Sequence, residues 1–287
     1  MVKIDLAKVS VREANEKLRE LGEKGESAEI INPDARHHLG VGLTAPINVK
    51  IKGSAGYFCA GLTDQAHFDV EANVGWGVGD NMYTGSVVVR GNAGAIPGVA
   101  IRGAEIVIHG NMGSRAGQVM KEGTLCCLGN ANFMAGYMMY GGRIIILGDS
   151  GERLGEDMSA GEIYVAGDLI SMGSDAKQVD LEQSDDESVR EFLDRYKIPF
   201  KGNLKKVMNA GTKLRYAKSE EQVRSIPFFT FSGTSDYWNS KIQEDIHIKS
   251  QIGRYRVRGY GGARPLPHFN DISFRKDITH AGNDPDV

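Results

Sequence analysis

A repeat of nineteen residues occupies the middle of this chain and constrains its fold more than any other feature. Small residues recur at this interval, and glycines within a unit follow the spacing G-x2-G-x3-G-x5-G with few exchanges. The leading positions are Gly53, Ala72, Gly91, Gly110, Gly129, Gly148 and Gly167. A fixed short period of this kind indicates a stacked-coil protein, in which each unit packs against its neighbours.

Three consecutive apolar residues lie shortly before each leading glycine in the later copies and predict short β-strands. The first and third members are apolar in every copy, which is the period of one buried face. We therefore expect Ile144 and Ile146 to face the interior. Ile145, the middle member of the same strand, should face outward and tolerate replacement better.

Two further columns follow the same period. Long side chains that we expect to fill the coil interior stand at Met82, Ile101, Met120, Met139 and Met158. Polar residues that we interpret as corner residues stand at Ser54, Asn73, Asn92, Asn111, Asn130, Asp149 and Asp168. Asn and Asp tolerate left-handed backbone, and stacked Asn side chains can bond along the axis as a ladder. Asp149 and Asp168 are thus interpreted as turn residues and not as a catalytic pair.

The glycine-rich units leave no room for a helix in each coil, so the strands of successive coils must pair in parallel. The chain is predicted to be an all-β protein, a parallel β-helix of about seven 19-residue coils over residues 46–178. Residues 1–45 form a lead-in whose helix begins with a capping box at Ser10 and Glu13. Residues 179–200 form a second helix, with a capping box at Ser184 and Glu187 and an apolar stripe that covers the open end of the stack.

The segment 201–287 differs from the repeats and is predicted to be a basic aromatic arm. Residues 201–265 hold thirteen Lys or Arg and five Asp or Glu, whereas the whole chain has a net charge of −3. Aromatic residues interleave with this charge, from Tyr216 to Tyr260. No nucleic-acid motif accompanies them, so we expect the arm to dock onto a protein and expect neither nucleic acid nor membrane as a partner.

Composition indicates a large core and a cytoplasmic protein. Apolar residues make up 41% of the chain, yet no apolar run is long enough to cross a membrane, and the N-terminus lacks the apolar core of a signal peptide. The three cysteines, Cys59, Cys126 and Cys127, fit a reducing compartment and are interpreted as structural.

No motif in the chain predicts chemistry of its own. The segment Gly75–Gly79 resembles a dinucleotide-binding loop, but the repeat accounts for its glycines and no helix is expected after it. The seven histidines show no paired metal-ligand spacing, and adjacent residues such as His37 and His38 seldom bind one ion. We therefore predict no catalytic residue, no cofactor-binding residue and no metal ligand, and an isolated chain without activity.

Several segments resemble a known family. They are Asn32–Pro33, His38–Gly42, Gly56–Gly61, Val74–Gly79, Arg115–Lys121, Leu154–Met158 and Gly173–Ala176. Over roughly residues 1 to 215, the chain resembles the GXGXG domain of glutamate synthase, a right-handed β-helix at the C-terminus of the large subunit. It is particularly similar to stand-alone forms, namely the β-helix subunit of methylamine–glutamate N-methyltransferase (N-methylglutamate synthase) and the GlxC-type proteins.

The resemblance implies a structural role in a complex. In this family the β-helix has no assigned catalytic residue and braces a class II glutaminase against an FMN-dependent synthase domain. The resemblance therefore implies that this chain is a non-catalytic subunit of a glutamine-dependent amidotransferase. Its expected partners are glutaminase-type and FMN-synthase-type subunits or a second copy of this chain. The FMN is expected in a partner subunit. Residues 252–271 are similar to the segment that leads into the FMN-binding part of relatives.

Two alternatives remain. One is a structural C-type subunit of formylmethanofuran dehydrogenase, which carries the same β-helix and would be favoured by a partner with a metal-cluster signature. The other is an acyltransferase with a left-handed hexapeptide β-helix, whose six-residue faces would give a period of eighteen. The observed period of nineteen argues against it.

Overall fold

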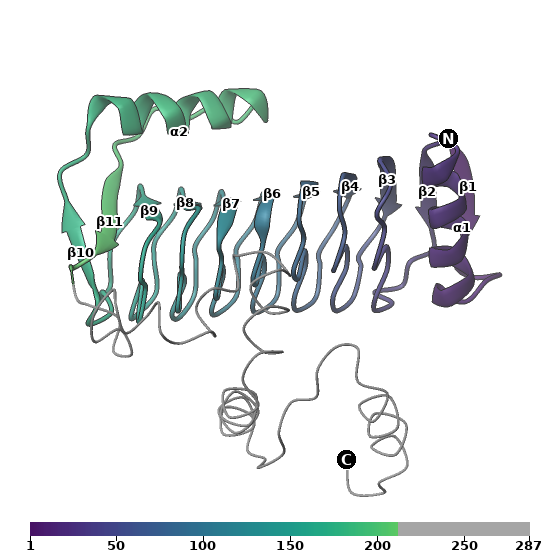
Figure 1. Ribbon diagram of the computed structural model, residues 1–287, viewed down its shortest axis with the longest axis horizontal. Coiled ribbons are helices and arrows are strands. Elements are labelled where there is room, and N and C mark those ends of the chain that lie inside the picture. The colour runs from purple at the N-terminus through teal and green to yellow at the C-terminus, as the bar shows by residue number, and fades with distance from the viewer. Residues whose placement is uncertain (212–287) are drawn as a thin grey trace, which may run out of the picture. The chain divides into compact units, whose positions relative to one another are not determined.

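The computed structural model describes residues 1–211, which form a parallel β-solenoid of about seven turns (Figure 1). Successive coils stack their strands into one 11-stranded sheet. The strands are β1 (Val2–Asp5), β2 (Ala28–Ile31), β3 (Ile47–Lys52), β4 (Ala66–Val70), β5 (Gly85–Val89), β6 (Arg102–Ile108), β7 (Glu122–Cys127), β8 (Arg143–Ile146), β9 (Glu162–Val165), β10 (Ala176–Val179) and β11 (Lys205–Asn209). The helices are α1 (Val11–Glu23) and α2 (Gln183–Arg195). The right-handed winding implied by the resemblance stays a prediction.

The register of the sheet confirms the predicted period. Val87 pairs with Ile106 and Ile106 pairs with Leu125, each one repeat further along the chain. The sheet also extends beyond the predicted repeat at both ends. At the N-terminal end β2 pairs in parallel with β3, and at the other end β11 lies between β9 and β10 and is antiparallel to both. The first residues of the predicted arm therefore belong to the solenoid, while the arm from residue 212 onward lies outside the described residues.

The predicted interior columns are confirmed. Met82, Ile101, Met120 and Met139 are fully buried, and Met158 is 1% exposed. Ile144 and Ile146 face the same interior and are fully buried. The seven turns thus share one continuous hydrophobic core along the axis.

Helix α2 does not cover the open end of the stack, as the sequence suggested, but runs along its flank over the later strands (Figure 1). The reason is a strip of apolar side chains on the outer face of four adjacent strands, at Val107, Cys126, Ile145 and Tyr164. The apolar stripe of α2, at Val189, Phe192 and Leu193, packs against this strip. Ile145 points outward as expected but is fully buried under the helix, which removes the reason for expecting it to tolerate replacement.

One predicted capping box is confirmed and the other is misplaced. The Ser10 N–H donates to Glu13 Oε2 at 2.7 Å, and the Glu13 N–H donates to Ser10 Oγ at 3.2 Å, so α1 begins where predicted. In α2 the Glu182 N–H donates to Asp185 Oδ2 at 3.0 Å. Helix α2 therefore begins before the predicted capping box, because the carboxylate that accepts the hydrogen bond from the N-cap N–H belongs to Asp185 and not to Glu187.

The polar corner residues form the predicted ladder, but not through left-handed backbone. Each side-chain oxygen from Asn73 to Asp149 accepts the backbone N–H of the equivalent residue in the next coil, over 2.7 to 2.9 Å. None of these residues has a positive φ. The left-handed positions are other corner residues, such as Ile96 (φ 52°) and Arg115 (φ 57°), whose N–H groups donate to the following coil.

Candidate interaction surfaces

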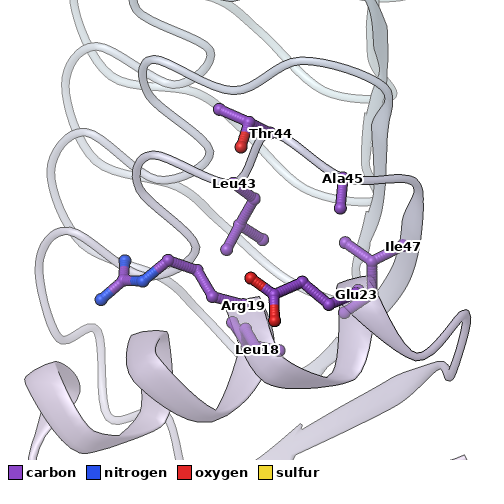
Figure 2. Close-up of a pocket in the computed structure, with 8 residues that line it drawn as sticks. Leu18, Arg19, Glu23, Leu43, Thr44, Ala45 and Ile47 are labelled. Atoms are coloured by element: carbon purple, nitrogen blue, oxygen red, sulfur yellow. The ribbon is translucent and has the colours of Figure 1, made fainter.

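A small cavity of about 50 Å³ lies between α1 and the segment 43–47 (Figure 2). Leu18 from the helix and Leu43 and Ile47 from the coil contribute its apolar side, and Arg19 and Glu23 stand at its polar side. Ligand sites usually enclose several hundred Å³. This cavity is therefore a gap in packing that is too small for a substrate.

A groove of about 370 Å³ follows the polar ladder over the later coils. It is lined by Asn111, Met112, Asn130, Ala131, Asn132, Asp149, Ser150, Gly151 and Ile170. The side-chain oxygens of Asn111 and Asn130 are engaged in the ladder, which leaves their amide N–H groups as donors at the groove. Asp149 is the single ionisable side chain among these lining residues, so the groove can form hydrogen bonds but lacks an acid and base pair.

Three aromatic rings stack along one corner of the solenoid at its N-terminal end. The His37 and Tyr57 ring centroids lie 4.3 Å apart at an interplanar angle of 11°, and Tyr57 and Trp76 lie 5.5 Å apart at 22°. Tyr57 is 42% exposed and Trp76 is 54% exposed. The His37 Nδ1 atom accepts the Tyr57 N–H at 2.9 Å, which holds the first ring in place. We call these three residues the aromatic column.

Glycines on the next coil allow these rings to lie close to the backbone. A Cβ atom at Gly75 would lie 2.5 Å from Tyr57 Cδ1, and one at Gly94 would lie 2.5 Å from Trp76 Cδ1. The glycine-rich segment 75–79 is therefore a coil corner under an aromatic ring. The chain continues from it into β5, so no helix N-terminus is available there for a pyrophosphate group.

A charged network fastens the end of the solenoid to α2. Lys206 Nζ lies 2.8 Å from Glu162 Oε1 and 2.7 Å from Asp185 Oδ1, and its side chain is 9% exposed. Tyr164 Oη lies within hydrogen-bond distance of both carboxylates, at 2.9 and 3.0 Å. Burial and the hydrogen bond to Glu162 raise the pKa of Tyr164, so this hydroxyl stays protonated. At the other end of the helix, Arg195 and Tyr196 both bind Glu105.

The remaining residues considered for chemistry are scattered. Within residues 1–211, no three His, Cys, Asp or Glu side chains lie close enough to hold a metal ion. His37 belongs to the aromatic column, His67 bonds Ser86 Oγ, and His109 bonds Arg90. All three cysteines are buried and unbridged, and burial raises the pKa of the Cys59 thiol to about 12.

Sequence reasoning missed both the aromatic column and the Lys206 network. The column had a detectable signal, because Tyr57 and Trp76 are one repeat apart on an outward position. The network had none, since Glu162, Asp185 and Lys206 belong to a coil, a helix and a returning strand that only the tertiary fold brings together.

The fold and these surfaces define a repeat protein that displays rows of side chains on a rigid parallel β-solenoid. The chain belongs to the family defined by the GXGXG motif, which matches residues 26–210. No helix within residues 1–211 is long and apolar enough to span a membrane.

Two known proteins show what the chain is similar to. It is 40% identical to Protein GlxC of Rhizobium meliloti (strain 1021) over 88 residues, which cover 30% of this chain and 39% of that protein. The chain therefore matches well under half the length of this relative. The fold is similar to one in the crystal structure of the formyltransferase/hydrolase complex (FhcABCD) from Methylorubrum extorquens with methylofuran. That likeness has a TM-score of 0.53 and 18% identity, over 68% of this chain and 84% of that chain.

Proposed function

We propose that this protein is a non-catalytic structural subunit of a glutamate synthase-like, glutamine-dependent amidotransferase complex. In this role it braces a class II glutaminase-type subunit against an FMN-binding synthase-type subunit, in an N-methylglutamate synthase-like or glutamate synthase-like assembly. Membership of the GXGXG family and the similarity to GlxC support the proposal.

The aromatic column is the observation that carries the structural role. Interfaces are enriched in Tyr and Trp, whose rings bury a large apolar area at low entropic cost. Tyr57 and Trp76 are nevertheless about half exposed, and they stack on each other in the space that Gly75 and Gly94 leave. A preordered aromatic surface of this kind suits a permanent partner.

The division of chemistry between subunits follows from the same surfaces. Within residues 1–211 the small cavity is too small for a substrate, and the groove lacks an acid and base pair. We infer that the glutaminase partner releases ammonia and that FMN is held by the synthase partner. This chain would position the two by binding each on a different row of the solenoid.

Co-expression with candidate glutaminase-type and FMN-synthase-type subunits tests the proposal. We expect a stable complex in which the yellow flavin colour follows the synthase partner and not the isolated chain. Replacing Tyr57 and Trp76 by Ala should reduce co-purification with one partner without unfolding the solenoid. Met172→Ala, which truncates an exposed apolar side chain at the other end of the stack, is the matched control. Assembly unaffected by loss of both rings would remove the basis of the proposal.

A second candidate is a structural C-type subunit of a formylmethanofuran dehydrogenase-like complex. The fold similarity to a chain of the formyltransferase/hydrolase complex favours it. Co-purification with a partner that carries a metal cluster, in place of a glutaminase, would support this candidate. An acyltransferase is disfavoured because the period of the repeat is nineteen residues and not eighteen.

A further inference from the structure

A second row of outward side chains differs from the rest of the surface. It contains Tyr83, Arg102, Lys121 and Tyr140, one from each of four consecutive coils. All four side chains are exposed, and the Arg102 guanidinium lies 5.2 Å from the centre of the Tyr83 ring. We call these four residues the basic row.

The two cations of the basic row lie on neighbouring coils, and Glu122 is the residue opposite Arg102 in the sheet. Elsewhere on the outer surface, neighbouring coils pair opposite charges, as in Lys52 with Glu71 and Arg90 with Asp69. Within residues 1–211, no acidic side chain forms an ion pair with Arg102 or Lys121. Partial burial and then the charge of Arg102 lower the pKa of Lys121. Cations that have no ion-pair partner within residues 1–211 leave their charge available to an anionic partner.

The acidic counterpart lies on α2 of the same chain. Glu187, Glu191 and Asp194 are exposed on the side of the helix opposite its buried stripe. The nearby cations are already engaged, because Arg190 pairs with Asp186 and Arg195 pairs with Glu105. We call these three residues the acidic ridge.

The two surfaces match in direction and spacing. Helix α2 runs along the axis of the stack, so the ridge and the row extend in the same direction (Figure 1). Residues three apart on a helix are separated by about 4.5 Å along its axis, as for Glu191 and Asp194. Neighbouring coils are separated by about 4.8 Å, as for Arg102 and Lys121.

We propose that this protein associates with a second copy of itself by docking the acidic ridge of one copy on the basic row of the other. Exposed ion pairs contribute little each, so their role is to set the register of the contact. Tyr83 and Tyr140, which flank the cations, supply apolar area at the two ends of the contact. This association is separate from the proposed glutaminase and synthase partners.

Charge reversal on the full-length chain tests the contact. Sedimentation velocity over a range of concentrations should show self-association of the wild type, weakened at least tenfold by Arg102→Glu with Lys121→Glu. Glu191→Lys with Asp194→Lys should weaken it to the same extent. An equal mixture of the two double variants should associate again, because the reversed row of one then faces the reversed ridge of the other. Raising the ionic strength from about 0.05 M to about 0.5 M should weaken the wild-type contact.

Lys24→Glu with Lys177→Glu is the control, since it changes the net charge equally at two exposed positions remote from the row. This variant should associate like the wild type, and circular dichroism should show all variants folded. A wild type that stays monomeric at every concentration overturns the proposal, as does a mixture that fails to associate. If the wild type is monomeric and the Arg102→Glu with Lys121→Glu variant loses a co-purifying protein, the basic row binds that protein and not a second copy of this chain.

Discussion

The Asn111 Oδ1 atom accepts a hydrogen bond from the Asn130 backbone N–H at 2.8 Å, and this contact repeats from coil to coil along the ladder. It ties successive corners together where the backbone is exposed.

Removing one ladder contact should have a modest cost. We expect Asn111→Ala to lower the free energy of unfolding by about 1 kcal/mol, the usual net value of one hydrogen bond. Asn111→Asp keeps the accepting oxygen, as Asp149 does naturally, and should lose less. Urea unfolding of the three proteins would measure this, and equal losses in both variants would show that the accepting oxygen is not the important atom.

Ile145 should matter as much as its inward-facing neighbours. We expect Ile145→Ala to cost about 2–5 kcal/mol, like Ile144→Ala, because both side chains are fully buried. Val88→Ala is the control, since Val88 has the equivalent outward position in β5 but is only half buried. A cost for Ile145→Ala that resembles the Val88→Ala value would show that α2 does not cover this strand in solution.

The Lys206 network should make the α2 end of the solenoid sensitive to acid. Burial raises the pKa of Asp185, but hydrogen bonds from Lys206, the Glu182 N–H and Tyr164 outweigh it and leave this pKa below its ordinary value. A depressed carboxyl pKa stabilises the fold above the unfolded pKa, which is about 4, and this stability is lost as pH falls through the folded pKa. Melting temperatures should therefore drop below about pH 4, and Asp185→Asn should show a smaller drop.

Removing the Lys206 side chain should lower the free energy of unfolding mainly because nearby carboxylates lose their cation. Lys206→Ala leaves the Glu162 and Asp185 carboxylates close together without a cation between them, and we expect it to cost about 3 kcal/mol at neutral pH. Combining it with Glu162→Gln and Asp185→Asn should recover part of this stability. A triple variant no more stable than Lys206→Ala would mean that lost packing, and not unpaired charge, causes the damage.

The three cysteines should not react with thiol reagents in the folded protein. Burial raises the pKa of Cys59 and of Cys127 to about 12, and it raises the pKa of Cys126 as well. Since thiolates are the reactive form, a thiol reagent at about pH 8 should label none of the three until the protein is denatured. Labelling of Cys126 alone in native buffer would indicate that α2 lifts from the flank.

The repeat determined most of the solenoid without a structure. A period of nineteen implies which residues stack, so the Met column, the inward Ile144 and Ile146 and the ladder could all be assigned from spacing. These features depend on local geometry that recurs in every coil. The same regularity identified all the ladder residues together. It did not reveal their backbone conformation, which is not left-handed.

The tertiary structure alone decided where α2 lies and what it buries. Val107, Cys126, Ile145 and Tyr164 form a hydrophobic strip only when four coils align, and packing the apolar stripe of the helix on this strip removes both surfaces from water. The Lys206 network likewise depends on β11 returning between β9 and β10. Periodicity describes contacts between equivalent positions, whereas these contacts join segments that have no equivalent in the repeat.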